Sequence, residues 1–134
     1  MKKLIALAIL VFAFCQIKAQ VLSKNDLTGN FTFNDSSIDR KMILPVTKSI
    51  VNIHFFFKMR VTEGSVTVEI KDPEGKYEGG FRVTGDGGTE NEDKVSKGEM
   101  THDVSFPIQG NWSIHIQSNH AAGTLSYEIK PSYN

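Results

Sequence analysis

Hydrophobic and polar residues alternate at every second position over most of the chain after residue 20. The clearest run is 51–61, where Phe55 and Phe57 fall on one face and His54 on the other. A period of two residues is typical of a β-strand with one buried face. The run therefore predicts a strand, with Phe56 as the one aromatic residue on its polar face.

Further segments alternate in the same way, and turn residues separate them. The sequence D-P-E-G at 72–75 predicts a tight turn, because Pro suits the second turn position and Gly the last. No segment after residue 20 shows a helical period over ten or more residues. The expected strands are 30–33, 51–61, 65–70, 76–84, 104–108, 112–116 and 125–129, with a turn at 120–123.

Seven or so short strands with turns between them predict an all-β fold, a single antiparallel β-sandwich or a closely related barrel. Trp112 keeps step with Ile114 and Ile116, so we expect its ring in the core. We likewise expect Phe106 and Ile108 to alternate inward in the strand 104–108.

The first nineteen residues have the layout of a secretory signal peptide. Lys2 and Lys3 precede an unbroken apolar run at 4–14, and Ala19 places a small residue at the cleavage position. The run is shorter than the roughly 20 apolar residues that span a bilayer. We therefore expect cleavage after Ala19 rather than a retained membrane anchor.

This prediction divides the chain into a signal peptide, residues 1–19, and a β-sandwich domain, residues 20–134. Cys15 is the only cysteine, and Phe14 before it is not the small residue that precedes a lipoprotein cysteine. The mature chain then has no cysteine, which excludes disulfides, thiol catalysis and cysteine-based metal sites. We expect a secreted or periplasmic protein with no membrane span in the mature chain.

Removal of the signal peptide changes the net charge. The full chain has 15 basic and 15 acidic residues. Three lysines leave with residues 1–19, so 12 basic residues remain against 15 acidic ones, a net charge of about −3. Nothing resembles the basic surface of a nucleic-acid-binding protein. The expected partner is an envelope or extracellular protein or a glycan.

The sequence contains no catalytic motif. No two of the four histidines have the H-x-x-x-H spacing of metal ligands, and no serine lies in a G-x-S-x-G motif. Alternation places His54 and His115 on outward faces and gives His102 the inward parity of Val104. We expect a protein that is not an enzyme.

The best candidate for a metal site is an acidic, glycine-rich segment at 85–93. Its carboxylates are Asp86, Glu90, Glu92 and Asp93, and calcium prefers such oxygen ligands. The spacing differs from that of an EF-hand loop, and acidic loops are commonly just solvated. A solvated loop is the expected reading and a calcium site the alternative, with no other cofactor expected.

Two strand-and-turn combinations carry a family resemblance. They are the strand 64–70 followed by the D-P-E-G turn at 72–75, and the G-N-W-S-I-H-I strand at 110–116. This order resembles the pre-peptidase C-terminal domains of secreted bacterial enzymes, and its end is similar to the P domains of subtilisin-like convertases. The resemblance covers about 50–129 and implies a jelly-roll-like accessory domain, although here no catalytic domain accompanies it.

These features together predict a non-catalytic, secreted or periplasmic β-sandwich accessory or binding protein. The alternative is a carbohydrate- or calcium-dependent adhesion module, and a small hydrolase or protease inhibitor is a third class. An exposed aromatic surface would favour sugar binding, because a sugar ring stacks on an aromatic face. Phe56 is the only strand aromatic that alternation directs outward.

Overall fold

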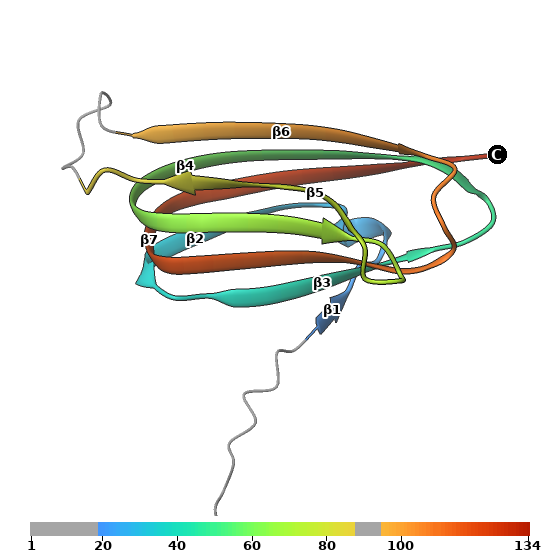
Figure 1. Cartoon of the computed structure of the whole chain (residues 1–134), viewed down its shortest axis with the longest axis horizontal. Helices are drawn as coiled ribbons and strands as arrows, with labels where there is room; N and C mark the ends of the chain where they lie inside the picture. Colours follow the sequence, from blue (N-terminus) through green and yellow to red (C-terminus); the bar gives the residue numbers. More distant parts are fainter. Residues whose placement is uncertain (1–18, 88–94) are drawn as a thin grey trace, which may run out of the picture.

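The computed structural model of the chain describes residues 19–87 and 95–134. Within them the fold is all-β, and seven strands form one mixed sheet that does not close on itself (Figure 1). One 3-10 turn, η1 (Lys24–Asp26), joins the first two strands. The strands are β1 (Ala19–Val21), β2 (Thr28–Ser36), β3 (Asp39–Val46), β4 (Ile50–Lys71), β5 (Tyr77–Thr84), β6 (Ser96–Ser105) and β7 (Gly110–Tyr133).

The two longest strands, β4 and β7, lie antiparallel to each other and both bend near their middle. Their register shifts around Glu63, where Gly64 of β4 has a φ of 68° and Gly123 of β7 a φ of 149°. Both ribbons reverse at this bend, at the left of Figure 1. The predicted break between 61 and 65 and the predicted turn at 120–123 are therefore bends inside continuous strands.

The bend divides the sheet into two halves. In the β2/β6 half, β2 and β6 flank residues 121–133 of β7 and 50–61 of β4. In the β3/β5 half, β3 and β5 flank residues 110–119 of β7 and 65–71 of β4. Every pairing is antiparallel except that of β1 with β3. The prediction of a wholly antiparallel sheet is wrong there, because the chain reverses twice between β1 and β3.

The apolar faces of the two halves pack against each other. The ring centroids of Phe55 and Trp112, which belong to different halves, are 6.5 Å apart, and those of Phe57 and Phe81 are also 6.5 Å apart. The predicted burial of Trp112 is confirmed, because only 1% of the residue is exposed. The fully buried residues of β4 and β7 include Ile53, Phe55, Phe57, Met59, Val61, Ile114, Ile116 and Leu125.

The predicted turn between β4 and β5 is present. Oδ1 of Asp72 accepts hydrogen bonds from the backbone N–H groups of Glu74 at 2.8 Å and Lys76 at 2.9 Å. Gly75 has a φ of 82°, and its N–H donates to the Asp72 carbonyl. Asp and Gly at these positions provide the side-chain acceptor and the left-handed conformation that such a turn requires.

The predicted strand 104–108 is displaced, because β6 runs from Ser96 to Ser105 and overlaps the prediction only at Val104 and Ser105. β6 ends at Ser105, so Phe106 and Ile108 are 83% and 48% exposed instead of facing inward. Pro107 has no N–H with which to continue the ladder, and Phe106 turns the chain with a φ of 52°. Turn chemistry here overrides the hydrophobic alternation.

The predicted signal peptide lies outside the described residues except for its last residue. Ala19 pairs with Lys41 in the register of β1 and β3. Across residues 19–87 and 95–134, no helix has the length and apolar character needed to cross a membrane.

Candidate functional site

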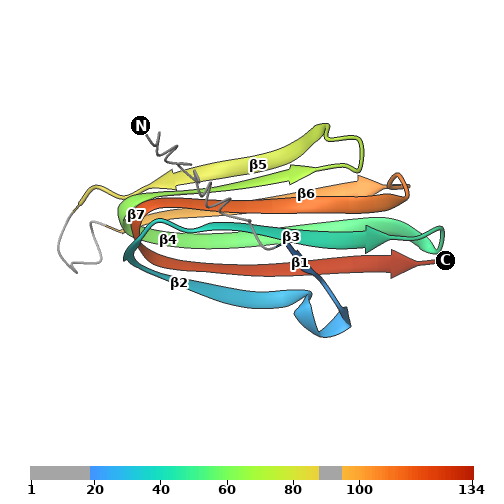
Figure 2. The same cartoon turned by 90° about the horizontal axis from the view of Figure 1, so that it is seen from below.

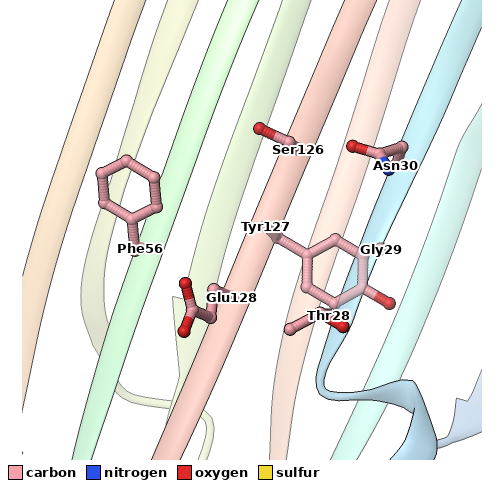
Figure 3. Close-up of a pocket in the computed structure, with 7 residues that line it drawn as sticks. All are labelled: Thr28, Gly29, Asn30, Phe56, Ser126, Tyr127 and Glu128. Atoms are coloured by element: carbon pink, nitrogen blue, oxygen red, sulfur yellow. The ribbon is translucent and has the colours of Figure 1, made fainter.

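A shallow hollow lies on the outer face of the β2/β6 half, where β2, β7 and β4 run side by side (Figure 3). Its volume is about 320 Å³. Three segments that are distant in sequence supply its lining, which consists of Thr28, Gly29, Asn30, Phe56, Ser126, Tyr127 and Glu128.

Phe56 provides the apolar wall of this hollow. Its neighbours Phe55 and Phe57 are fully buried, so alternation turns Phe56 to the outer face, where it is half-buried. Its cross-strand partners are Glu128 on β7 and Thr101 on β6. Figure 3 shows its ring close to the Glu128 carboxylate. The predicted outward position of Phe56 is confirmed.

Two ion pairs and one histidine–carboxylate hydrogen bond lie on the strands around Phe56. They are Glu128–Lys130 at 2.6 Å, His54–Asp103 at 2.6 Å and Lys58–Glu99 at 3.4 Å. Each of the six side chains keeps at least 36% of its surface exposed. Exposed pairs of this kind add little to stability. Their charged groups remain accessible to a ligand in water.

Gly29 and Tyr127 also line the hollow, and Figure 3 shows the Tyr127 ring, which packs on Phe57 of the core, directed from β7 toward β2. A Cβ at Gly29 would lie 2.7 Å from the Tyr127 hydroxyl oxygen, so a side chain there would displace the ring. The hydroxyl donates to the Asp26 carbonyl at 2.9 Å. Burial, aided by the Asp26 charge, raises the pKa of Tyr127 above 10.0. Hydrogen bonds from Ser23 lower the pKa of Asp26.

A second hollow of about 290 Å³ adjoins the first and shares Asn30 and Ser126 with it. We call the two hollows together the outer groove. The second hollow is also lined by Phe31, Thr32, Lys58, Arg60 and Thr124. The outer groove therefore has two cationic side chains in one hollow and the Glu128 carboxylate in the other.

The sequence pattern identified Phe56 but missed the polar side chains around it. Alternation directs Asn30 outward from β2, and Ser126 and Glu128 outward from β7. What brings them together is the strand register, which pairs Asn30 with Ser126 and Phe56 with Glu128. Alternation gives the face of a side chain and contains no signal for its partner on another strand.

Of the four carboxylates of the alternative calcium site, only Asp86 lies in the described residues, and it is exposed. Glu90, Glu92 and Asp93 lie outside them. Backbone N–H groups on either side of Asp86 donate to carbonyl groups in the bend of β4. Residues 19–87 and 95–134 contain no group of three or more His, Cys, Asp or Glu side chains placed to hold a metal ion. The solvated loop remains a prediction, and the four-carboxylate calcium site remains its alternative.

The histidines follow their predicted orientations. His54 pairs with Asp103, and His115 pairs with Asp39, both on outer faces of the sheet. His102 faces inward, and its Nε2 is a buried atom without a hydrogen-bond partner in the part of the chain that the structure describes.

Comparison with protein families and curated proteins identified no relative of this chain. The chain matches no protein-family model, and no curated protein matches it.

Proposed function

We propose that this chain is a non-catalytic binding domain that acts in the periplasm or outside the cell and holds its ligand in the outer groove. In this proposal the two halves of the sheet form a jelly-roll-like β-sandwich that serves as the scaffold. The observation that carries the proposal is a half-exposed Phe56 ring that lines the same hollow as its cross-strand neighbour Glu128 and, on the other side of β7, the Asn30 amide.

The scaffold supports binding because it fixes the groove before a ligand arrives. Buried side chains precede and follow Phe56 on β4, and cross-strand pairing holds Asn30 beside Ser126. A preorganised surface loses little conformational entropy when it binds. The groove is shallow and open, which suits a ligand that lies along the surface of a sheet.

Export is supported by the charged, apolar and small-residue segments of the first nineteen residues. The exported protein is expected to begin at Gln20, and mass spectrometry of the intact mature chain tests this. A lipid attached to Cys15 at the N-terminus would contradict it.

A carbohydrate is the ligand class that the outer groove favours. A sugar ring can stack its apolar face on Phe56 and bond through its hydroxyl groups to the Glu128 carboxylate, while the Asn30 amide on the other side of β7 can bond to a neighbouring sugar. Lys58 and Arg60 in the adjoining hollow suit an acidic group on the next sugar. An oligosaccharide that contains uronic acids therefore matches both hollows.

A glycan array tests this proposal, with cello-, chito- and xylo-oligosaccharides beside alginate and galacturonate oligomers. Phe56→Ala is expected to weaken binding of the retained glycan about two- to tenfold, because an aromatic stacking contact is worth about 0.5–1.5 kcal/mol. Phe106→Ala removes an exposed aromatic ring outside the groove and is expected to leave binding unchanged.

Two results would contradict the proposal. One is the absence of any retained glycan, and the other is an equal loss of binding in Phe56→Ala and Phe106→Ala. The recovered glycan is expected to be chemically intact, whereas cleavage during incubation would show an enzyme.

A further inference from the structure

The free edge of β6 is the most regular edge of the sheet. β6 pairs with β4 over ten residues without a register shift, and in the described residues it pairs with no other strand. The register of β2 shifts between Asn34 and Ser36, that of β5 shifts at Lys71, and β1 has only three residues. Bulges and short strands protect sheet edges from pairing. β6 has neither protection.

The hydrogen-bond pattern shows which residues of β6 offer backbone groups to a neighbour. The N–H of Phe106 donates to the Val51 carbonyl at 2.8 Å, one step beyond the last β4–β6 pair. Hydrogen-bonded pairs alternate along an antiparallel ladder, so the even-numbered residues of β6 bond to β4. The odd-numbered residues point their N–H and C=O groups to the free edge. They are Lys97, Glu99, Thr101, Asp103 and Ser105, and all are exposed.

We propose that β6 pairs antiparallel with β6 of a second copy of this chain, around a twofold axis at Met100. Only odd-numbered residues can form the new hydrogen-bonded pairs, so each must lie opposite an odd-numbered residue of the second copy. Two registers meet this condition over nearly the whole strand, one centred on Met100 and one on Thr101. The register centred on Met100 places Lys97 opposite Asp103 of the second copy, on both sides of the axis.

Charge selects between these registers. The alternative is centred on Thr101 and places Glu99 opposite Asp103 of the second copy, which are both negative. Opposite charges directly across two strands stabilise their pairing, and like charges destabilise it. The two Lys97–Asp103 pairs therefore favour a second copy in the Met100-centred register.

The rest of β6 is compatible with this pairing. Met100 packs on the core from the inner face and would meet Met100 of the second copy at the axis. β6 forms the upper boundary of the molecule in Figure 1, and Figure 2 shows β5 and β6 along the same side. The twofold axis would be perpendicular to the sheet, so both outer grooves would face the same way. Two grooves that face the same way could bind one extended ligand together and so raise its avidity, and only this consequence depends on the proposed function.

Sedimentation velocity of the purified protein at micromolar concentrations tests the proposal. The wild type is expected to dimerise reversibly. Lys97→Asp and Asp103→Lys are each expected to raise the dimer Kd at least about tenfold, because each replaces two attractive pairs with two repulsive ones. An equimolar mixture of the two variants is expected to restore a dimer, since each mixed pair again joins Asp to Lys.

Lys48→Asp is the matched control, because it makes the same charge change at an exposed residue in the turn between β3 and β4. It is expected to dimerise like the wild type. Circular dichroism of each variant verifies its fold. A monomeric wild type would overturn the proposal, and the β6 edge could then pair only with a strand of another protein. Three other results would also overturn it. They are an unchanged dimer Kd in Lys97→Asp, an equal rise of the dimer Kd in Lys48→Asp, and a mixture of Lys97→Asp and Asp103→Lys that does not dimerise.

Discussion

At the scale of single residues, Trp112 illustrates how far alternation determines an environment. Its parity with Ile114 and Ile116 predicted burial, and the structure places its ring against Phe55. The hydrogen bond from its Nε1–H to the Ile108 carbonyl, at 2.8 Å, is a second anchor that parity does not contain. This bond joins the core to the loop that presents Phe106 and Ile108 to solvent.

We expect Trp112→Ala to lower the free energy of unfolding by about 3–5 kcal/mol, the usual cost of removing a buried aromatic side chain. A loss of that size is a large part of the 5–15 kcal/mol that stabilises a typical domain. Trp112→Phe keeps a ring and is expected to lose less. Urea unfolding measures both. A stable Trp112→Ala variant that has lost its ligand would show that the ring is a binding surface instead.

Tyr127 makes stability depend on alkaline pH. Its folded pKa is raised above 10.0 by burial, so its contribution is present below pH 10.0 and is lost as the pH rises through the folded pKa. Tyr127→Phe is expected to lower the free energy of unfolding by about 0.5–1.5 kcal/mol at neutral pH, because the hydrogen bond to the Asp26 carbonyl is lost. Above pH 10.0 the free energy of unfolding of this variant is expected to fall less steeply than that of the wild type.

Urea unfolding from neutral to strongly alkaline pH measures this dependence. Tyr77→Phe, which removes an exposed hydroxyl group, is the control and is expected to follow the wild type. An identical alkaline slope in the wild type and Tyr127→Phe would show that other groups cause the loss.

At the scale of elements, alternation located strand segments better than strand ends, and β1 and β3 were not among the predicted strands. The alternating runs at 51–61 and 65–70 are correct as strand segments, yet both belong to β4. Backbone geometry at Gly64 keeps the strand continuous, and this depends on contacts with β7 that lie far away in sequence. The polar surroundings of Phe56 could not be predicted for the same reason, because they depend on register.

Gly64 and Gly75 have similar φ angles, but replacing each with alanine is expected to lower the free energy of unfolding by different amounts. A Cβ at Gly64 would overlap the carbonyl oxygens of Asn119 and His120, whereas a Cβ at Gly75 would meet nothing within 4 Å. Gly75→Ala is expected to cost about 1–2 kcal/mol, the strain of a left-handed residue. Gly64→Ala is expected to cost a further 1–3 kcal/mol or so for the backbone shift it forces. Equal losses in urea unfolding would contradict the role of Gly64 in the bend.

At the scale of the whole molecule, the fold is held together by packing between the two halves of one sheet. The carboxylates at 85–93 lack the spacing of an EF-hand loop, so we expect this acidic segment to be solvated. Millimolar calcium is then expected to raise the Tm no more than magnesium does. A calcium-specific rise that disappears in Asp86→Asn/Asp93→Asn would contradict this and favour a calcium-dependent adhesion module.

The most direct test of binding in the outer groove is an NMR titration of the isotopically labelled protein. The probe is the oligosaccharide that the glycan array retains most strongly. Saturable shifts are expected in the backbone amides of Thr28, Asn30, Phe56, Ser126 and Glu128, and in Phe56→Ala they are expected to saturate only at higher oligosaccharide concentrations. Shifts that instead cluster at Phe106 and Ile108, or an absence of saturable shifts anywhere, would contradict binding in the groove.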